Sequence, residues 1–450
     1  MKFRRTVSLF LLTVLLTGLC LTPRTVSAEP LDVKATAALL VDLNGDVVLY
    51  EKNAGERRYP ASITKVMTAL LVLEAVDSGK LSLTQEITAS ETALMNLDSY
   101  GSSADIKPGE IMTVKDLLYC MLLVSANESC NILAEAVDGS VDAFVAHMNR
   151  RAEELGCEDT HFTNTHGLHN PDHYTTAWDI YLLAREAIKN DTLMALCNTL
   201  SYDVPATNMS ESRELHTTNS LISNWKILGY LYEGASGIKT GTTDEAGHCL
   251  VSSASRQGRT MICVVLGCEG SGDTVESFSE TARLYDYGFD NFSLRTVLRE
   301  DDLIQEVPVS LSKENSAVVV HPAQDTMAIL PNDVNPEDLE RTVTLRSETA
   351  MAPITAGDVL GEITLSYEGR ACATVDLLAQ YDVTASRFLT AKYHVIQFFR
   401  KTVVQVILVI LAVLIIALIV WLKVLRPRRR YYSHRRPRNT RRIYHGRRHR

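Results

Sequence analysis

The sequence lacks the cysteine pattern of a zinc or dithiol redox site. Its nine cysteines include no CxxC pair, which both kinds of site usually contain. Internal repeats are absent too, and no segment before residue 423 has low complexity. Cys20 falls within the first 28 residues, and the other eight cysteines show no spacing that assigns disulfides. We interpret most of these eight as small buried apolar side chains. They are Cys120, Cys130, Cys157, Cys197, Cys249, Cys263, Cys268 and Cys372.

Positive charge is scarce between the two ends of the chain. Residues 29–422 contain 28 Lys and Arg against all 54 Asp and Glu, which is a net charge of −26. A surface this acidic repels phosphate, which argues against nucleic acid as a partner of this part. The tail 423–450 is the opposite, with 13 Lys and Arg and no acid. Beside a membrane, such a tail favours contact with anionic lipid headgroups over nucleic acid.

Charge is missing altogether from residues 402–422. A helix of this length, at about 1.5 Å per residue, matches the hydrocarbon core of a bilayer, so we predict a transmembrane helix. The basic start of the chain, the apolar run after it and the small residues before Ala28 predict a signal peptide cleaved after Ala28. A lipoprotein signal is the weaker alternative, because Leu19 precedes Cys20. Since positive tails stay in the cytoplasm, we expect a single-pass membrane protein with its domains outside the cytoplasm.

The order of predicted elements indicates two domains between signal and membrane helix. A β-hairpin is predicted around Asn44 and Gly45, a mainly helical stretch at 113–200, and further strands that turn at Gln257 and Gly258. Strands on both sides of a helical middle predict an α/β (α+β) sandwich whose first and last strands share one antiparallel sheet. Short alternating runs after it predict a small all-β domain. The expected parts are a signal peptide (1–28), a sandwich domain (29–292), a β domain (293–385), a linker (386–401), a membrane helix (402–422) and a tail (423–450).

The segment "RRYPASITKVMTALLVLEAV", residues 57–76, places a hydroxyl and an amine at the start of an apolar helix. Pro60 favours a first helical turn, which places Ser62 near the positive end of the helix dipole. Lys65 follows one turn later on the same face. A desolvated lysine near other positive groups can accept a serine proton, so the pair predicts a nucleophile and a general base. Taken alone, the pair is a weak signal that is better explained as a capping serine and a snorkelling lysine.

Two further motifs follow in the chain. "VSANES" contains Ser125 and Asn127 after an apolar run, and "GIKTGTT" contains Lys239, Thr240 and Gly241 at the start of a predicted strand. Each alone could be an ordinary turn or hairpin rim, although a glycine in a strand also allows close approach of a ligand or another backbone. Together, SxxK, SxN and KTG on a helix, a loop and a strand are a specific combination.

With these motifs the sequence resembles the low-molecular-weight penicillin-binding proteins, the serine-type D-alanyl-D-alanine carboxypeptidases. The resemblance covers about residues 33–290 and extends to "HMNRRAEELG" and "THFTNTHGLHNPDHYTTAWD". The stretch "APITAGDVLGEITLSYEGRACATVDLLAQYDV" resembles the C-terminal domain of that family. The resemblance implies a β-lactamase/transpeptidase-like fold, no cofactor, stem peptides ending in D-Ala-D-Ala as substrates, and β-lactams as inhibitors. The long basic tail departs from the family pattern.

The resemblance also implies a role for each motif residue. Ser62 would attack the carbonyl of the penultimate D-alanine, and Lys65 would take its proton. Ser125 would pass a proton to the departing amine. The Asn127 amide would orient Lys65 and the substrate backbone, and the backbone N–H groups of Ser62 and Thr242 would form the oxyanion hole.

The KTG motif would bind the end of the substrate. By resemblance, Lys239 would lower the pKa of Lys65 and attract the terminal carboxylate, while Thr240 would hydrogen-bond that carboxylate. Gly241 would belong to the same substrate-binding strand.

Three other functions compete with this interpretation. A class A β-lactamase resembles the same fold and motifs, but it needs a glutamate between SxN and KTG, and residues 160–179 contain none. A metal-dependent enzyme could use His166, His169 and His173 with Asp172, but this spacing matches no helix-borne HExxH site, and the Asn-Pro within it breaks a helix. A non-catalytic, membrane-tethered scaffold that binds the cell wall is the third, and the three intact motifs argue against it.

Overall fold

The computed structural model describes residues 31–95, 97, 101–271 and 274–425. The predicted signal peptide and nearly all of the predicted basic tail lie outside these residues. The chain forms two compact units, the first made mostly of residues up to Leu298 and the second mostly of those that follow. Each unit is described by itself below.

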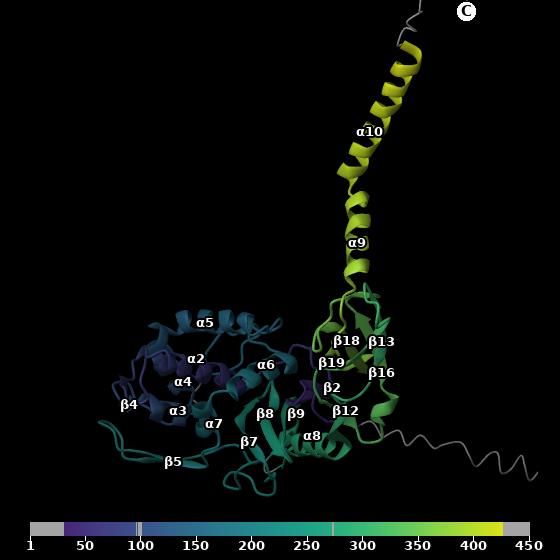
Figure 1. The fold of residues 1–450 in the computed structure, drawn as a ribbon. Coiled ribbons are helices and arrows are strands. Elements are labelled where there is room, and N and C mark those ends of the chain that lie inside the picture. The colour runs from purple at the N-terminus through teal and green to yellow at the C-terminus, as the bar shows by residue number, and fades with distance from the viewer. Residues whose placement is uncertain (1–30, 96, 98–100, 272–273, 426–450) are drawn as a thin grey trace, which may run out of the picture. The chain divides into compact units, whose positions relative to one another are not determined.

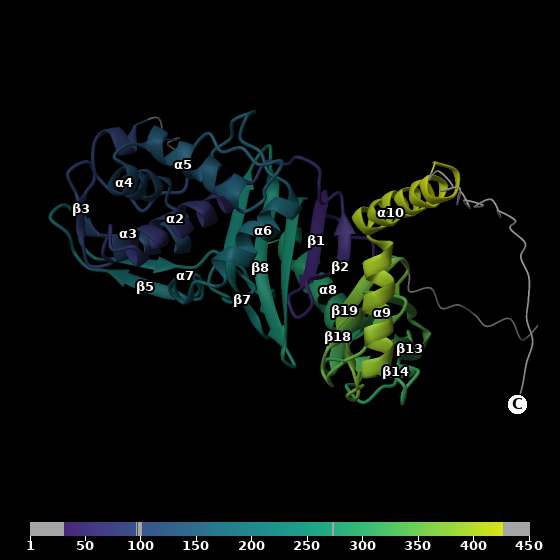
Figure 2. The ribbon, with the colours of Figure 1, turned by 45° about the horizontal axis from the view of Figure 1, so that its top comes forward.

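The first unit contains a five-stranded antiparallel sheet with the strand order β2-β1-β9-β8-β7 (Figures 1 and 2). β1 pairs with β9, so strands from before and after the helical middle share one antiparallel sheet, as the sequence predicts. Gln257 and Gly258, with φ of 54° and 77°, form the tight turn between β8 and β9. The strands are β1 (Ala37–Asp42), β2 (Val47–Lys52), β7 (Ala235–Thr243), β8 (Gly247–Arg256) and β9 (Arg259–Cys268).

The sheet separates two hydrophobic cores. Alternate residues of β1 point to opposite faces, so Ala37, Leu39 and Val41 join one core while Ala38 and Leu40 join the other. Helix α8 (Glu276–Asn291) covers the second face. The first face is covered by the helical middle of the chain.

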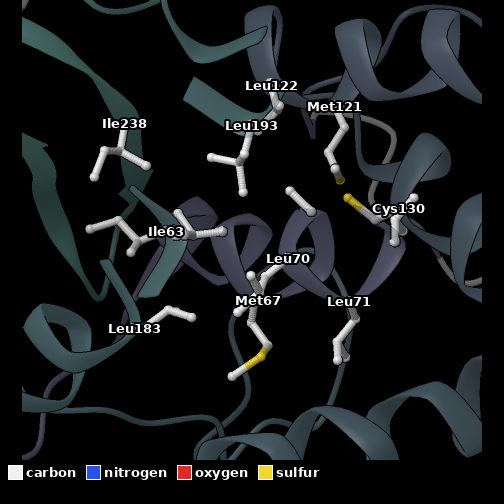
Figure 3. Close-up of a cluster of buried hydrophobic side chains, with 14 of the residues drawn as sticks. Ile63, Met67, Leu70, Leu71, Met121, Leu122, Cys130, Leu183, Leu193 and Ile238 are labelled. Carbon is white, nitrogen blue, oxygen red and sulfur yellow. The ribbon is translucent and has the colours of Figure 1, made fainter. Parts of the chain in front are cut away.

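Helix α2 (Lys65–Asp77) is the centre of that helical layer and is buried on nearly every side. Figure 3 shows Ile63, Met67, Leu70 and Leu71 of this segment among side chains of neighbouring helices. A helix that is apolar all round is stable only when other helices enclose it. Those helices are α3 (Val114–Leu123), α4 (Asn127–Asp138), α5 (Val141–Glu154), α6 (Ala177–Ala187) and α7 (Asp191–Cys197). Of the eight described cysteines, seven are buried and none is paired, as predicted for most of them.

Short hairpins and turns complete the first unit. β3 pairs with β4, β5 with β6, β10 with β11, and β12 with β15. The short strands are β3 (Glu86–Thr88), β4 (Ile111–Thr113), β5 (Ser201–Val204), β6 (Arg213–His216), β10 (Gly270–Ser271), β11 (Thr274–Val275), β12 (Phe292–Leu298) and β15 (Thr326–Pro331). The 3-10 turns of the described chain are η1 (Ala61–Thr64), η2 (Thr92–Leu94) and η3 (Pro336–Asp338).

The C-terminal region is all-β up to its two last helices, in agreement with the predicted fold class. β13 pairs with β14 in antiparallel and with β17 in parallel fashion. The strands are β13 (Gln305–Ser310), β14 (Ala317–Pro322), β16 (Glu340–Leu345), β17 (Ala350–Met351), β18 (Val359–Tyr367) and β19 (Arg370–Ala379). The segment predicted as a linker contains a helix, α9 (Arg387–Arg400). α10 (Thr402–Val420) and the π-helical turn η4 (Trp421–Leu425) follow. Among the described residues, Thr402–Lys423 is the one helical stretch long and apolar enough to cross a membrane.

Candidate active site

Ser62 lies on the 3-10 turn η1, directly before α2. The sequence predicts Pro60 in the first helical turn, but Pro60 instead caps this 3-10 turn, and Lys65 is the first residue of the α-helix. Ala61 has a positive φ of 47°, which bends the chain at the entry to the turn. Ser62 is partly exposed while its neighbours Ala61 and Ile63 are buried. The hydroxyl is therefore presented at the surface of the helical layer.

The Lys65 amine makes hydrogen bonds to three other segments of the site. The side chain is fully buried, and its Nζ donates to Ser62 Oγ at 2.8 Å, to Asn127 Oδ1 at 2.8 Å and to the His166 carbonyl at 2.7 Å. These three bonds match the three donors of an ammonium group. Because burial penalises the charged form, it lowers the pKa of Lys65 to about 8, against smaller opposing effects of Cys130 and Glu128.

This pKa shift agrees with the expected desolvation of Lys65 but not with the expected effect of Lys239. Burial is its largest cause, and the charge of Lys239 is not among its causes. The Coulombic effect acts in the other direction, because Lys65 lowers the pKa of Lys239, which burial already lowers to about 7. Two buried ammonium groups disfavour each other's charge.

The loop 164–168 supplies a contact that sequence reasoning missed. The His166 carbonyl accepts a hydrogen bond from Lys65, and Asn164 Oδ1 accepts from the His166 and Gly167 N–H groups at 3.2 and 2.6 Å. Gly167 has a φ of 90°, and a Cβ there would lie 1.9 Å from the Ala61 carbonyl oxygen. Only glycine permits this approach. The sequence signal for this loop is "TNTHG", which is rich in turn-forming residues. The prediction considered mainly the histidines of this stretch.

His166 and His173 take part in hydrogen bonds within this loop region. His166 Nδ1 accepts from the Leu168 N–H at 3.2 Å. His173 Nδ1 accepts from the Thr163 N–H at 3.1 Å, which places its proton on Nε2, 2.8 Å from Thr64 Oγ1. Burial lowers the pKa of both imidazoles to about 3. No group of three or more metal-ligating His, Cys, Asp or Glu side chains occurs in the described part of the chain.

Ser125 and Asn127 come from the junction of α3 and α4. Ser125 has a positive φ of 65°, and its buried Oγ has no hydrogen-bond partner among the described residues. Asn127 begins α4, and its backbone N–H donates to the Ser102 carbonyl at 2.9 Å. The buried Glu128 carboxylate accepts from the Ala104 N–H at 2.7 Å and so holds the same loop. The SxN motif thus presents an unpaired hydroxyl and an amide and also fixes the loop that carries Ser102.

Strand β7 brings the KTG motif against the Ser62 turn. A Cβ on Gly241 would lie 2.9 Å from the Pro60 carbonyl oxygen and 3.1 Å from the Ser62 nitrogen. The absent side chain lets the two backbones approach. The Thr240 hydroxyl lies 2.8 Å from the Thr218 hydroxyl. Lys239 is buried behind them, and its Nζ donates to the Thr240 carbonyl at 3.0 Å.

These elements enclose a cavity of about 270 Å³. The predicted residues Ser62, Ser125, Thr240, Gly241 and Thr242 line it. The other three predicted residues, Lys65, Asn127 and Lys239, lie behind this lining. Lys65 and Asn127 form one hydrogen-bonded group with Ser62. The site therefore combines a nucleophile, a buried amine and several hydroxyls in one concave surface, which is an arrangement suited to acyl transfer.

Comparisons with known proteins agree with this geometry. The family model of the D-alanyl-D-alanine carboxypeptidases (peptidase S11) matches residues 24–270, and that of the penicillin-binding protein 5 C-terminal domain matches 292–385. The D-alanyl-D-alanine carboxypeptidase DacF of Bacillus subtilis is 31% identical over 360 residues, 79% of this chain and 88% of the relative.

Two solved structures are similar over most of the chain. Penicillin-binding protein 5 from Haemophilus influenzae is 27% identical with a TM-score of 0.61, covering 79% of this chain and 99% of its own. The D-alanyl-D-alanine carboxypeptidase DacD from Francisella tularensis is 26% identical with a TM-score of 0.63, covering 82% and 98%. The chain therefore belongs to the penicillin-binding protein 5-like D-alanyl-D-alanine carboxypeptidases of peptidase family S11, and it is a serine carboxypeptidase.

Proposed function

We propose that this protein removes the terminal D-alanine from peptidoglycan stem peptides through an acyl-enzyme on Ser62. The observation that supports this most directly is the 2.8 Å hydrogen bond between a fully buried lysine, Lys65, and the partly exposed Ser62 hydroxyl. Burial keeps a fraction of this amine neutral near pH 7, which a general base requires.

In the first step, Ser62 Oγ attacks the carbonyl carbon of the penultimate D-alanine, and its proton moves to the neutral Lys65 amine. The backbone N–H groups of Ser62 and Thr242 stabilise the oxyanion of the tetrahedral intermediate. When the peptide bond breaks, the proton passes through the Ser125 hydroxyl to the departing D-alanine nitrogen. Water then attacks the Ser62 ester and releases the shortened stem peptide, which restores the hydroxyl.

The remaining motif residues position the substrate. The Asn127 amide holds Lys65 through its oxygen, and its nitrogen would contact the peptide backbone. The Thr240 hydroxyl binds the terminal carboxylate, and Lys239 supports Thr240 from behind. Gly241 keeps the strand close to Ser62 so that the peptide bond reaches the nucleophile.

β-Lactams are inhibitors in this proposal. The lactam carbonyl is attacked in the same way, but its leaving group stays attached through the rest of the molecule. No aspartate or glutamate is among the described residues that line the cavity, so it offers no carboxylate to activate water for rapid deacylation. This favours a long-lived penicilloyl ester over the alternative of a class A β-lactamase.

We also propose a single-pass arrangement in the bacterial cell membrane. The helical stretch Thr402–Lys423 would cross the bilayer, with the catalytic and β domains outside the cytoplasm and the basic tail beside anionic lipid. The predicted parts, from the signal peptide to the tail, belong to this proposal.

The test uses the full chain in detergent and measures D-alanine release from diacetyl-L-Lys-D-Ala-D-Ala, with parallel labelling by fluorescent penicillin. Ser62→Ala should abolish both, whereas Ser78→Ala, at the far end of α2, should leave both unchanged. Release that persists in Ser62→Ala would refute the proposal. Labelling of Ser62 without release would indicate another substrate, and the absence of both would favour the scaffold.

A further inference from the structure

The cavity beside Ser62 has an unusual charge distribution. Among the described residues that line it, Lys226 is the one lysine or arginine, and none is an aspartate or glutamate. The other polar lining consists mainly of hydroxyl groups, including those of Ser125, Thr218 and Thr240. A substrate that ends in a carboxylate therefore meets a single cationic side chain on the surface of this cavity.

Lys239 cannot supply this charge in the same way. Its side chain is buried, it is absent from the cavity lining, and its Nζ already donates to the Thr240 carbonyl. Burial lowers its pKa to about 7, and the charges of Lys65 and Lys226 act in the same direction. The KTG lysine therefore sits behind the hydroxyls and does not face the cavity.

The neighbours of Lys226 hold its backbone while leaving its side chain free. The preceding Trp225 stacks on His216, with ring centroids 3.6 Å apart, and the following Ile227 packs against the second hydrophobic core. The Tyr232 N–H donates to the Leu221 carbonyl at 2.9 Å and closes the loop that contains these residues. Lys226 itself is exposed and has no hydrogen-bond or ion-pair partner in the described part of the chain.

We propose that Lys226 is a specificity-determining residue that recognises the free C-terminal carboxylate of the stem peptide. This inference rests on the proposed carboxypeptidase function, which supplies a carboxylate next to the scissile bond. The ammonium group would pair with that carboxylate from the outer wall of the cavity while the Thr240 hydroxyl binds it from strand β7. Lys226 comes from the loop before the KTG strand, outside the three motifs, and so adds a charge that those motifs do not provide.

The test compares two peptides on the full chain in detergent. One is diacetyl-L-Lys-D-Ala-D-Ala with a free carboxylate, and the other is the same peptide with a C-terminal amide. Because an exposed ion pair is partly screened, Lys226→Met should raise KM for the acid about fivefold and change kcat by less than about twofold. The KM for the amide should stay unchanged, since it has no charge to pair.

Two further variants control this experiment. Lys226→Arg retains the cation and should restore the preference for the acid. Lys313→Met removes an exposed lysine from the second unit, which does not line the cavity, and should behave as the wild type. The effect of Lys226→Met should shrink as salt is added, because salt screens an exposed pair.

An unchanged ratio of the KM values for the acid and the amide in Lys226→Met would overturn the inference, as would equal losses of activity on both peptides.

Failure of the carboxypeptidase function gives a different result. If the wild type is labelled by penicillin but releases no D-alanine, acylation rates by penicillin and by its methyl ester decide the role of Lys226. If Lys226→Met no longer reacts faster with the free acid than with the methyl ester, the result supports the role of Lys226. An unchanged preference for the free acid refutes that role. A wild type that shows neither labelling nor release overturns both proposals.

Discussion

Raising the pH from about 6 to about 9 should strongly increase the rate at which Ser62 is acylated, because only the neutral Lys65 amine accepts the hydroxyl proton. With a pKa of about 8, this amine is neutral in roughly 1% of molecules at pH 6 and in roughly 90% at pH 9. The acylation rate should therefore rise about 90-fold over this range, with its midpoint near the Lys65 pKa. A lysine at its ordinary pKa of 10.5 would be neutral in only about one molecule in 3,000 at pH 7, so burial supplies a factor of about 300.

Glu128→Gln tests the sign of this electrostatic account. The Glu128 carboxylate raises the pKa of Lys65, so removing its charge should lower that pKa and move the midpoint of the pH profile to lower pH. The amide oxygen can still accept the Ala104 N–H, which keeps the loop in place. The other titratable groups that interact with Lys65 are Cys130, His166, His173 and Lys239, and the variant leaves them unchanged.

The assay is the second-order rate of labelling by fluorescent penicillin at a series of pH values, with the full chain in detergent. Thermal unfolding at each pH separates loss of the fold from loss of the base. A rate that does not change between about pH 6 and about pH 9 would refute the role of Lys65 as the base. A midpoint that moves upward in Glu128→Gln would refute the assigned sign.

Three more predictions follow from the packing of the site. Gly241→Ala should slow acylation about 100-fold, because its Cβ would lie 2.9 Å from the Pro60 carbonyl oxygen and push the strand outward; labelling within about threefold of wild type would contradict this. Ser125→Ala should slow acylation by at least about 100-fold without lowering Tm, since the Oγ has no partner to lose among the described residues; a lower Tm measured by calorimetry would argue against this. Acid should weaken the fold through His166 and His173, because burial lowers their pKa from 6.5 to about 3. The stability that these neutral histidines contribute is complete above pH 6.5 and is lost as the pH falls towards 3. At pH 5 the free energy of unfolding should be lower by about 2 kcal/mol per histidine than at pH 7. Urea unfolding at the two pH values measures this difference, and equal free energies of unfolding would contradict it.

The predictable features of the fold are those set by neighbours in the chain. Asn44 with Gly45 and Gln257 with Gly258 mark hairpins because their backbones favour tight turns, and both hairpins are present in the structure. The uncharged run from Thr402 is long enough to span a bilayer, and it forms the predicted helix. Pro60 was expected in the first turn of an α-helix but caps a 3-10 turn instead, because the choice between the two turns depends on the packing of Ala61 against other segments.

For the site, the residue types and their spacing in the chain set which chemistry is available and place Ser62 and Lys65 within reach of each other. Residues three apart on a helical turn lie on one face wherever the helix is located. Tertiary structure alone decided that Asn127 and the His166 carbonyl, 62 and 101 positions from Lys65 in the chain, complete its hydrogen bonds. It also decided that burial lowers the Lys65 pKa, because the loss of water around an amine depends on every segment that covers it, and no local pattern in the sequence encodes that enclosure.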